Sequence, residues 1–189
     1  MKSGPLSILT LLLVVAVSML IMIAPTFFTK GVSRVSLNKK IDLALIANGE
    51  KDIKILFFGY SGCVDVCTPR LYALDKFYKS LDEKTRERVG VEFLDVSTPE
   101  DKTLPDKFAK FFNKEFKGVY MDKSVLYDYT RAFDVYFAPG LMDETEYDHT
   151  SNVYLVKKTK DAKTLRYVYN AYPYDFKQME LDIKELMND

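Results

Sequence analysis

The pattern of apolar and polar positions separates a continuous apolar segment near the start of the chain from a longer, mixed region. Residues 6–24 carry no charge and are bounded by Pro5 and Pro25. As a helix this segment would extend about 28 Å, close to the roughly 30 Å of a bilayer's hydrocarbon core. The apolar part of a cleaved signal peptide, the alternative, is usually only about 7–15 residues long. We therefore predict a signal-anchor helix in residues 1–25 and a tether in residues 26–45.

The basic residues around this segment give conflicting signals about its orientation. Lys2 precedes it, whereas Lys30, Arg34, Lys39 and Lys40 follow it. By the distribution of positive charge, the region that follows would lie in the cytoplasm. A short basic tip followed at once by an apolar stretch is, however, the layout of an export signal. We expect the exported orientation.

Short apolar runs in the rest of the chain predict strands. Residues 53–60 and 89–96 are apolar and rich in β-branched and aromatic side chains, which is typical of buried strands. Residues 153–157 and 165–171 alternate between apolar and polar across a polar turn, which predicts a pair of strands. Residues 138–151, between the helical region and this pair, show no regular pattern.

Helical spacing of apolar residues fills the gaps between these strands. The first predicted helix spans 68–84, with Thr68 as its N-cap and Pro69 at its first position. The other predicted helices begin near residue 105, span 124–133, and begin near Asp175. This order of strands and helices is that of an α/β domain with a mixed sheet, and we predict a thioredoxin-like fold for residues 46–189.

The composition excludes one class of partner but does not by itself define a function. The 189 residues include 27 Lys+Arg and 27 Asp+Glu, so the formal net charge is zero. No clustered basic face is evident, which excludes nucleic acid as the expected partner. A single domain of about 150 residues buries roughly 68–70% of its surface without covalent cross-links. The fold therefore does not depend on a disulfide.

The two cysteines, Cys63 and Cys67, lie directly after the first predicted strand and at the start of the first predicted helix. In open α/β sheets, reactive sites lie past the carboxyl ends of strands. Across a helical turn, a four-residue separation puts two Cα atoms about 6 Å apart, which suits a disulfide and also a shared metal ion. A helix N-terminus favours the thiolate form. A metal site, a redox pair and a structural disulfide all remain open on this basis.

His149 is the only histidine of the chain. If the fold places it beside the cysteines, two thiolates and an imidazole form a soft three-donor site that suits Cu(I). Structural zinc usually takes about four protein ligands, and this chain has no fourth Cys or His. Asp65 or Asp148 could complete a site for a harder ion such as Cu(II). A single histidine in a polar loop can equally have no ligand role.

Four segments, in the same order, resemble the Sco/SenC family. Residues 58–67 (FGYSGCVDVC) are similar to the family signature FGYxxCPDxCP, and residues 94–101 (LDVSTPED) resemble its VDPERD region. Residues 116–136 resemble its GLT…YxVY stretch, and residues 147–151 (YDHTS) resemble its DHS segment. Two positions depart from the signature: Val64 replaces a proline, and Thr68 is inserted before Pro69. Proline at these points would stiffen the loop.

The resemblance implies a membrane-tethered thioredoxin-like domain that binds copper through Cys63, Cys67 and His149. It further implies copper delivery to the binuclear copper centre of cytochrome c oxidase, or reduction of that centre's cysteines. The implied partner is the copper-centre subunit or another copper carrier. Because the N-terminus lacks an Arg-rich transit peptide, we expect a bacterial inner-membrane protein with its soluble domain in the periplasm.

The alternative function is that of an enzyme, an anchored thiol-disulfide oxidoreductase that uses Cys63 and Cys67 as its catalytic redox pair. Ordinary thioredoxin-like reductases have two residues between their cysteines and a proline before the strand that faces them. This chain has three residues between the cysteines, and the segment before Val153 contains no proline. Both differences favour copper binding, and Tyr60 stands where a peroxiredoxin-like site needs threonine.

Overall fold

The computed structural model describes residues 10, 12–19, 22, 33–42, 51–140, 146–160 and 162–189. The described residues of the N-terminal segment are helical. Within the described parts of the chain, no helix is both long enough and apolar enough to cross a membrane. The rest of the anchor predicted for residues 1–25 lies outside them, as does half of the predicted tether.

Residues 34–189 form one compact unit of strands and helices. The strands are β1 (Arg34–Lys40), β2 (Ile53–Gly59), β3 (Val89–Asp95), β4 (Lys117–Val119), β5 (Phe137–Pro139), β6 (Tyr147–His149), β7 (Val153–Lys158) and β8 (Lys163–Tyr169). The helices are α2 (Cys67–Ser80), α3 (Glu83–Arg88), α4 (Leu104–Phe112), α5 (Lys123–Phe133) and α6 (Phe176–Asn188).

Six strands form a mixed sheet in the order β1-β8-β7-β2-β3-β4. The central strand β2 pairs in parallel with β3 and antiparallel with β7, and all seven of its residues are buried. A strand buried on both faces requires an apolar run, which explains the composition of residues 53–59. Strands β5 and β6 form a separate two-stranded sheet.

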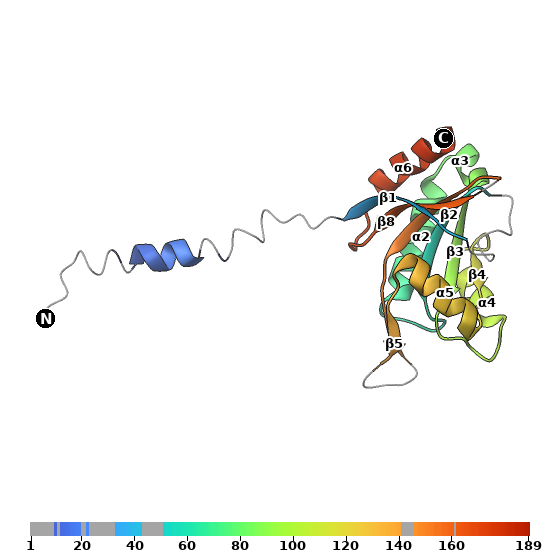
Figure 1. The fold of residues 1–189 in the computed structure, drawn as a ribbon, viewed down its shortest axis with the longest axis horizontal. Helices are drawn as coiled ribbons and strands as arrows, with labels where there is room; N and C mark the ends of the chain where they lie inside the picture. Colours follow the sequence, from blue (N-terminus) through green and yellow to red (C-terminus); the bar gives the residue numbers. More distant parts are fainter. Residues whose placement is uncertain are drawn as a thin grey trace, which may run out of the picture. The chain divides into compact units, whose positions relative to one another are not determined.

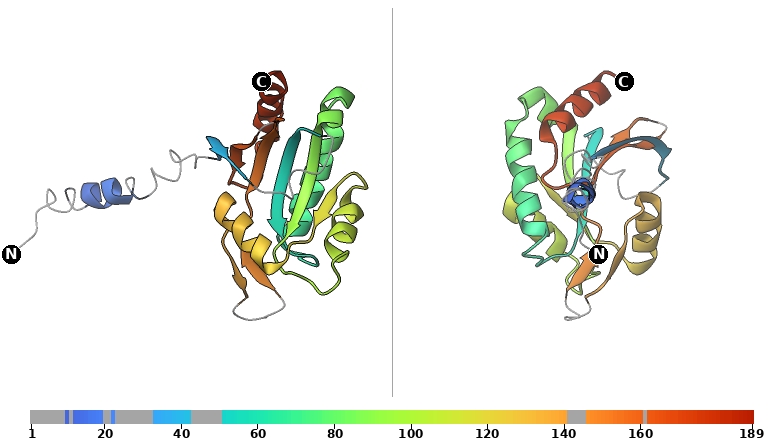
Figure 2. Two further views of the ribbon diagram at one scale, coloured as in Figure 1. Left: turned by 45° about the vertical axis from the view of Figure 1, so that its right-hand side comes forward. Right: turned by 90° about the vertical axis from the view of Figure 1, so that its left-hand side faces the viewer.

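Helices cover both faces of the six-stranded sheet (Figures 1 and 2). Ile55 and Phe57 of β2 pack with residues of α2, α4 and α6 on one face. Leu56 and Phe58 point the other way and pack with residues of α5. Alternate residues of β2 thus pack into two separate cores, one on each face of the sheet. Because β2 is packed on both faces, the position of its last residue is fixed.

The predicted mixed α/β fold is confirmed, with differences at the less regular segments. The helix predicted over 68–84 ends earlier, at Ser80 of α2, and α3 begins at Glu83, where Asp82 caps it by accepting from the backbone N–H of Thr85. Residues 137–139 and 147–149 are strands rather than irregular chain. Strand β1, inside the segment assigned to the tether, pairs with β8 and belongs to the sheet.

Candidate metal site

The loop between β2 and α2 carries both cysteines. The backbone N–H of Cys63 donates to the carbonyl of Tyr60 at 3.2 Å, closing a turn in which Gly62 has a φ of 95°. Glycine adopts this conformation without steric cost. Cys67 is the first residue of α2, and its backbone N–H donates to Sγ of Cys63 at 3.2 Å. An amide at the helix start thus points at the first sulfur, which favours its anionic form.

The start of α2 differs from the sequence prediction. Its N-cap is Val66, whose side chain makes no capping hydrogen bond, rather than Thr68. Thr68 lies inside the first turn, and its hydroxyl donates to the carbonyl of Cys63 at 2.8 Å. A local hydroxyl-to-backbone bond is a common alternative to capping. The residue inserted relative to the family signature therefore ties the helix to the cysteine loop.

The third predicted donor, His149, comes from the end of β6, where it pairs with Phe137 of β5. Its Nδ1 lies 3.1 Å from the carbonyl of Thr150. A carbonyl only accepts, so Nδ1 carries the proton and Nε2 keeps a free lone pair. The rings of Phe57 and Tyr60 stand edge-on to the imidazole, with centroids 6.5 Å and 6.0 Å away. These contacts hold Nε2 toward the cysteines.

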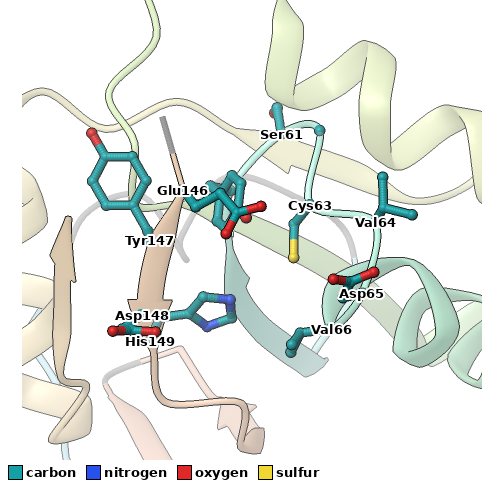
Figure 3. Close-up of a pocket in the computed structure, with 11 residues that line it drawn as sticks. Ser61, Cys63, Val64, Asp65, Val66, Glu146, Tyr147, Asp148 and His149 are labelled. Carbon is teal, nitrogen blue, oxygen red and sulfur yellow. The ribbon is translucent and has the colours of Figure 1, made fainter. Parts of the chain in front are cut away.

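The structure brings all three predicted donor residues together. Nε2 of His149 lies 3.5 Å from Sγ of Cys67, and the ligand atoms of Cys63, Cys67 and His149 all lie within 4.8 Å of one another. Both cysteines are buried free thiols. Figure 3 shows Cys63 and His149 directed into a shared pocket. The volume of this pocket is about 480 Å³. One ion at this point could contact all three side chains.

The two thiols have opposite acid–base properties. A hydrogen bond from the Cys67 thiol is the main reason why the pKa of Cys63 lies far below its ordinary value, and it outweighs the opposing effect of burial. The shared hydrogen bond with Cys63 and then burial raise the pKa of Cys67. Cys63 is thus the nucleophilic, ligand-ready sulfur of the pair.

Alkylation should distinguish the two thiols. In the native reduced chain at pH 6, we expect iodoacetamide to modify Cys63 at least about tenfold faster than Cys67, because only the thiolate reacts and an unperturbed thiol with pKa about 8.5 is almost fully protonated there. Mass spectrometry of quenched samples gives both rates. In the denatured chain the rates should converge. Faster modification of Cys67 in the native chain would contradict the assignment.

Carboxylates surround the mouth of the pocket. Asp65, Glu146 and Asp148 line it, and among its described lining residues there is no lysine or arginine. Such a rim attracts cations toward the buried sulfurs. Asp65 and Asp148 lie outside the three-donor cluster, although the sequence allowed them as extra ligands.

Two tyrosines near the cluster were not predicted as parts of the site. The rings of Tyr60 and Tyr147 lie 5.6 Å apart and both line the pocket. Burial raises the pKa of Tyr60. Their position could have been anticipated only from their closeness in sequence to Cys63 and His149.

Comparison with known proteins extends these observations. The family model described as SCO1/SenC matches residues 48–188. A Stutzerimonas stutzeri protein, named as a candidate copper-binding protein, is 26% identical over 105 residues, which cover 54% of this chain and 52% of that protein. The match thus spans about half the length of this curated relative.

Two solved structures share the fold. The apo Sco1 protein of Thermus thermophilus matches with a TM-score of 0.62 and 23% identity over 84% of this chain and 95% of that one. Copper-bound ScoI of Arabidopsis thaliana matches with a TM-score of 0.61 and 19% identity over 72% and 84%. At these identities the likeness establishes the thioredoxin-like Sco fold. Because the family model matches residues 48–188, which are well over half of this chain, the chain belongs to the SCO1/SenC family.

Proposed function

We propose that this chain binds copper through Cys63, Cys67 and His149 and acts as a membrane-anchored copper chaperone. The observation that carries the proposal is the convergence of the only two cysteines and the only histidine on one point. Cys67 and His149 are separated by 82 positions in the sequence, yet their side chains lie 3.5 Å apart. A cluster that unites all the cysteines and histidines of a chain is an arrangement that suits a thiophilic ion.

The donor set favours copper over the other common ions. Two thiolates and a neutral imidazole suit Cu(I), whereas structural zinc sites normally have about four protein ligands. The chain has no further cysteine or histidine to supply the fourth. The bacterial relative is named for copper binding, and the Arabidopsis structure holds copper, which adds support from outside the chain.

Membership of the SCO1/SenC family supports the wider role. We propose that the copper is delivered to the binuclear centre of cytochrome c oxidase, and that the partner is the copper-centre subunit or another copper carrier. The apolar segment at residues 6–24 would anchor the chain in a bacterial inner membrane, with the domain in the periplasm. An exported position is consistent with a site built on two reactive thiols.

Metal content and thiol titration test the proposal directly. The purified, reduced chain should bind one Cu(I) per molecule in competition with a chromophoric chelator, and copper loading should protect both thiols from Ellman's reagent. A double Cys63→Ser, Cys67→Ser variant is the control and should bind no copper. A native chain that binds no copper, or binds zinc in preference, would contradict the proposal.

A thiol-disulfide oxidoreductase is the second candidate, and two observations favour it. The sulfurs of Cys63 and Cys67 lie within 4.8 Å of each other, and Cys63 has the lowered pKa of an attacking thiol. Such an enzyme needs only the two cysteines. Copper binding also needs His149, so the requirement for the imidazole separates the two functions.

A further inference from the structure

We propose that Asp95 is a positioning residue for the metal-binding loop, an inference that rests on the proposed function for the identity of the ion. Asp95 is the last residue of β3 and is fully buried. It does not belong to the metal-binding cluster. Its carboxyl group holds the start of the loop that presents Cys63, and through that loop it acts on the metal.

The carboxyl group of Asp95 bridges two segments. One oxygen accepts from the backbone N–H of Ser61 at 2.9 Å and from its hydroxyl at 2.5 Å. The other oxygen accepts from the backbone N–H of Ser97 at 2.8 Å and from its hydroxyl at 2.5 Å. All four contacts use the carboxyl oxygens as acceptors, so the group is well satisfied despite its burial.

The two serines differ in what they connect. Ser97 lies two residues after Asp95, so its contacts only shape the local turn. Ser61 lies 34 positions away in the sequence and two residues before Cys63. Of the two serines, Ser61 is therefore the one that ties the carboxyl group to the cysteine loop.

The backbone around Asp95 supplies a fixed reference point. Asp95 lies opposite Gly59 in the parallel β2–β3 pair, and the backbone N–H of Val96 donates to the carbonyl of Gly59 at 2.8 Å. The carboxyl group is thus attached to the most buried part of the sheet, at the point where β2 gives way to the loop. Metal-ligating side chains on a loop stay mobile unless contacts from residues outside the ligand set hold the loop in place.

This arrangement predicts that Asp95 sets how well the loop is organised for metal binding. Removing the contacts that support metal ligands from outside typically lowers metal affinity by about 10–100-fold. Without the two bonds to Ser61, the loop that carries Cys63 would sample other conformations. Metal binding would then require it to be ordered, which lowers affinity.

Three substitutions separate positioning from general stability. Asp95→Asn replaces one acceptor oxygen by a donor, Ser61→Ala removes the hydroxyl contact to the loop, and Ser97→Ala removes the matching local contact. In the full chain we expect Cu(I) affinity to fall about tenfold for Asp95→Asn and several-fold for Ser61→Ala. Ser97→Ala should stay within about twofold of the native chain, although it loses an equally short hydrogen bond.

Two further readouts report on the loop itself. The sulfur-to-copper charge-transfer absorption of the Cu(II) complex should change in Asp95→Asn and Ser61→Ala and not in Ser97→Ala. Amide hydrogen exchange over residues 61–66 needs no metal, and it should accelerate in the same two variants. Asp182→Asn provides a control for loss of a buried carboxyl group, since Asp182 bonds Arg34 and Gln178 beside the opposite edge of the sheet.

The outcomes are distinct. Failure of the native chain to bind copper would overturn the proposed function, while the hydrogen-exchange comparison would still decide whether Asp95 positions the loop. Equal effects of Ser61→Ala and Ser97→Ala on affinity and exchange would overturn the positioning role. So would unchanged exchange in Asp95→Asn. If Asp95→Asn does not fold, the two serine variants alone decide.

Discussion

Replacing His149 by alanine should lower Cu(I) affinity by more than about 100-fold, because even the loss of an outer partner of a metal ligand costs about 10–100-fold. The imidazole is one of three donors whose ligand atoms lie within 4.8 Å of one another. Its Nε2 faces Sγ of Cys67, and no other imidazole exists in the chain to replace it. The remaining two thiolates would bind the ion with lower affinity.

The same variant should retain the thiol chemistry of the pair. Cys63 and Cys67 keep their mutual hydrogen bond, which is the main cause of the lowered pKa of Cys63. Disulfide formation in glutathione buffers should therefore persist, with a moderate change in equilibrium. A copper chaperone whose third ligand has been removed should lose copper binding and keep its thiol redox activity.

The neighbouring Asp148→Asn provides the comparison for His149→Ala. Asp148 is an exposed residue of the same strand, so its loss removes a rim charge worth at most about 1 kcal/mol. A fall of no more than about fivefold is expected from that energy. Unchanged binding of Cu(I) and Cu(II) in His149→Ala would remove the histidine from the ligand set.

The second large effect is expected at Gly59, the last residue of β2. A Cβ atom there would lie 2.6 Å from Sγ of Cys67 and 2.9 Å from the ring of Phe93, and both neighbours are fully buried. Neither can move away without disturbing the core. Gly59→Ala should therefore destabilise the fold by about 1–3 kcal/mol and displace the sulfur of Cys67. Copper affinity should fall with it.

Gly90→Ala is the matched control on the adjacent strand β3. The closest atoms to its new Cβ would be Nζ and Cδ of the buried Lys54, at 3.3 Å and 3.4 Å, which are tight contacts but longer than the 2.6 Å and 2.9 Å approaches at Gly59. Urea denaturation of both variants measures the stability difference, and chelator competition measures the copper affinity. Equal stabilities for Gly59→Ala and Gly90→Ala would show that the close approach of Cys67 is not restrictive.

The regular strands and helices of this fold could be predicted because their burial requires apolar residues in a recognisable pattern along the sequence. Strands β2 and β3 are buried along their whole length, and such runs stand out in a sequence. Strand β1 has mostly exposed residues and forms the sheet edge, so no apolar run marks it. The three-residue strands β5 and β6 are too short for a periodic pattern.

The donor residues of the site could be predicted because cysteine and histidine are so rare in this chain. Their convergence could not be derived from spacing, since His149 is placed by a hairpin that no local pattern indicated. The role of Asp95 was equally hidden, because its bond to Ser61 depends on the pairing of β2 with β3. The start of α2 was misplaced because Val66 caps it without a side-chain bond.

The placement of His149 on the small β5–β6 sheet has a kinetic consequence. The two cysteines are attached to β2 and α2, which are held in the main core, whereas the imidazole depends on a hairpin of three residue pairs. Short ladders that are only half-buried open locally far more often than a fully buried central strand. We expect the imidazole to be the first donor to dissociate, so that the opening rate of this hairpin sets the residence time of the ion.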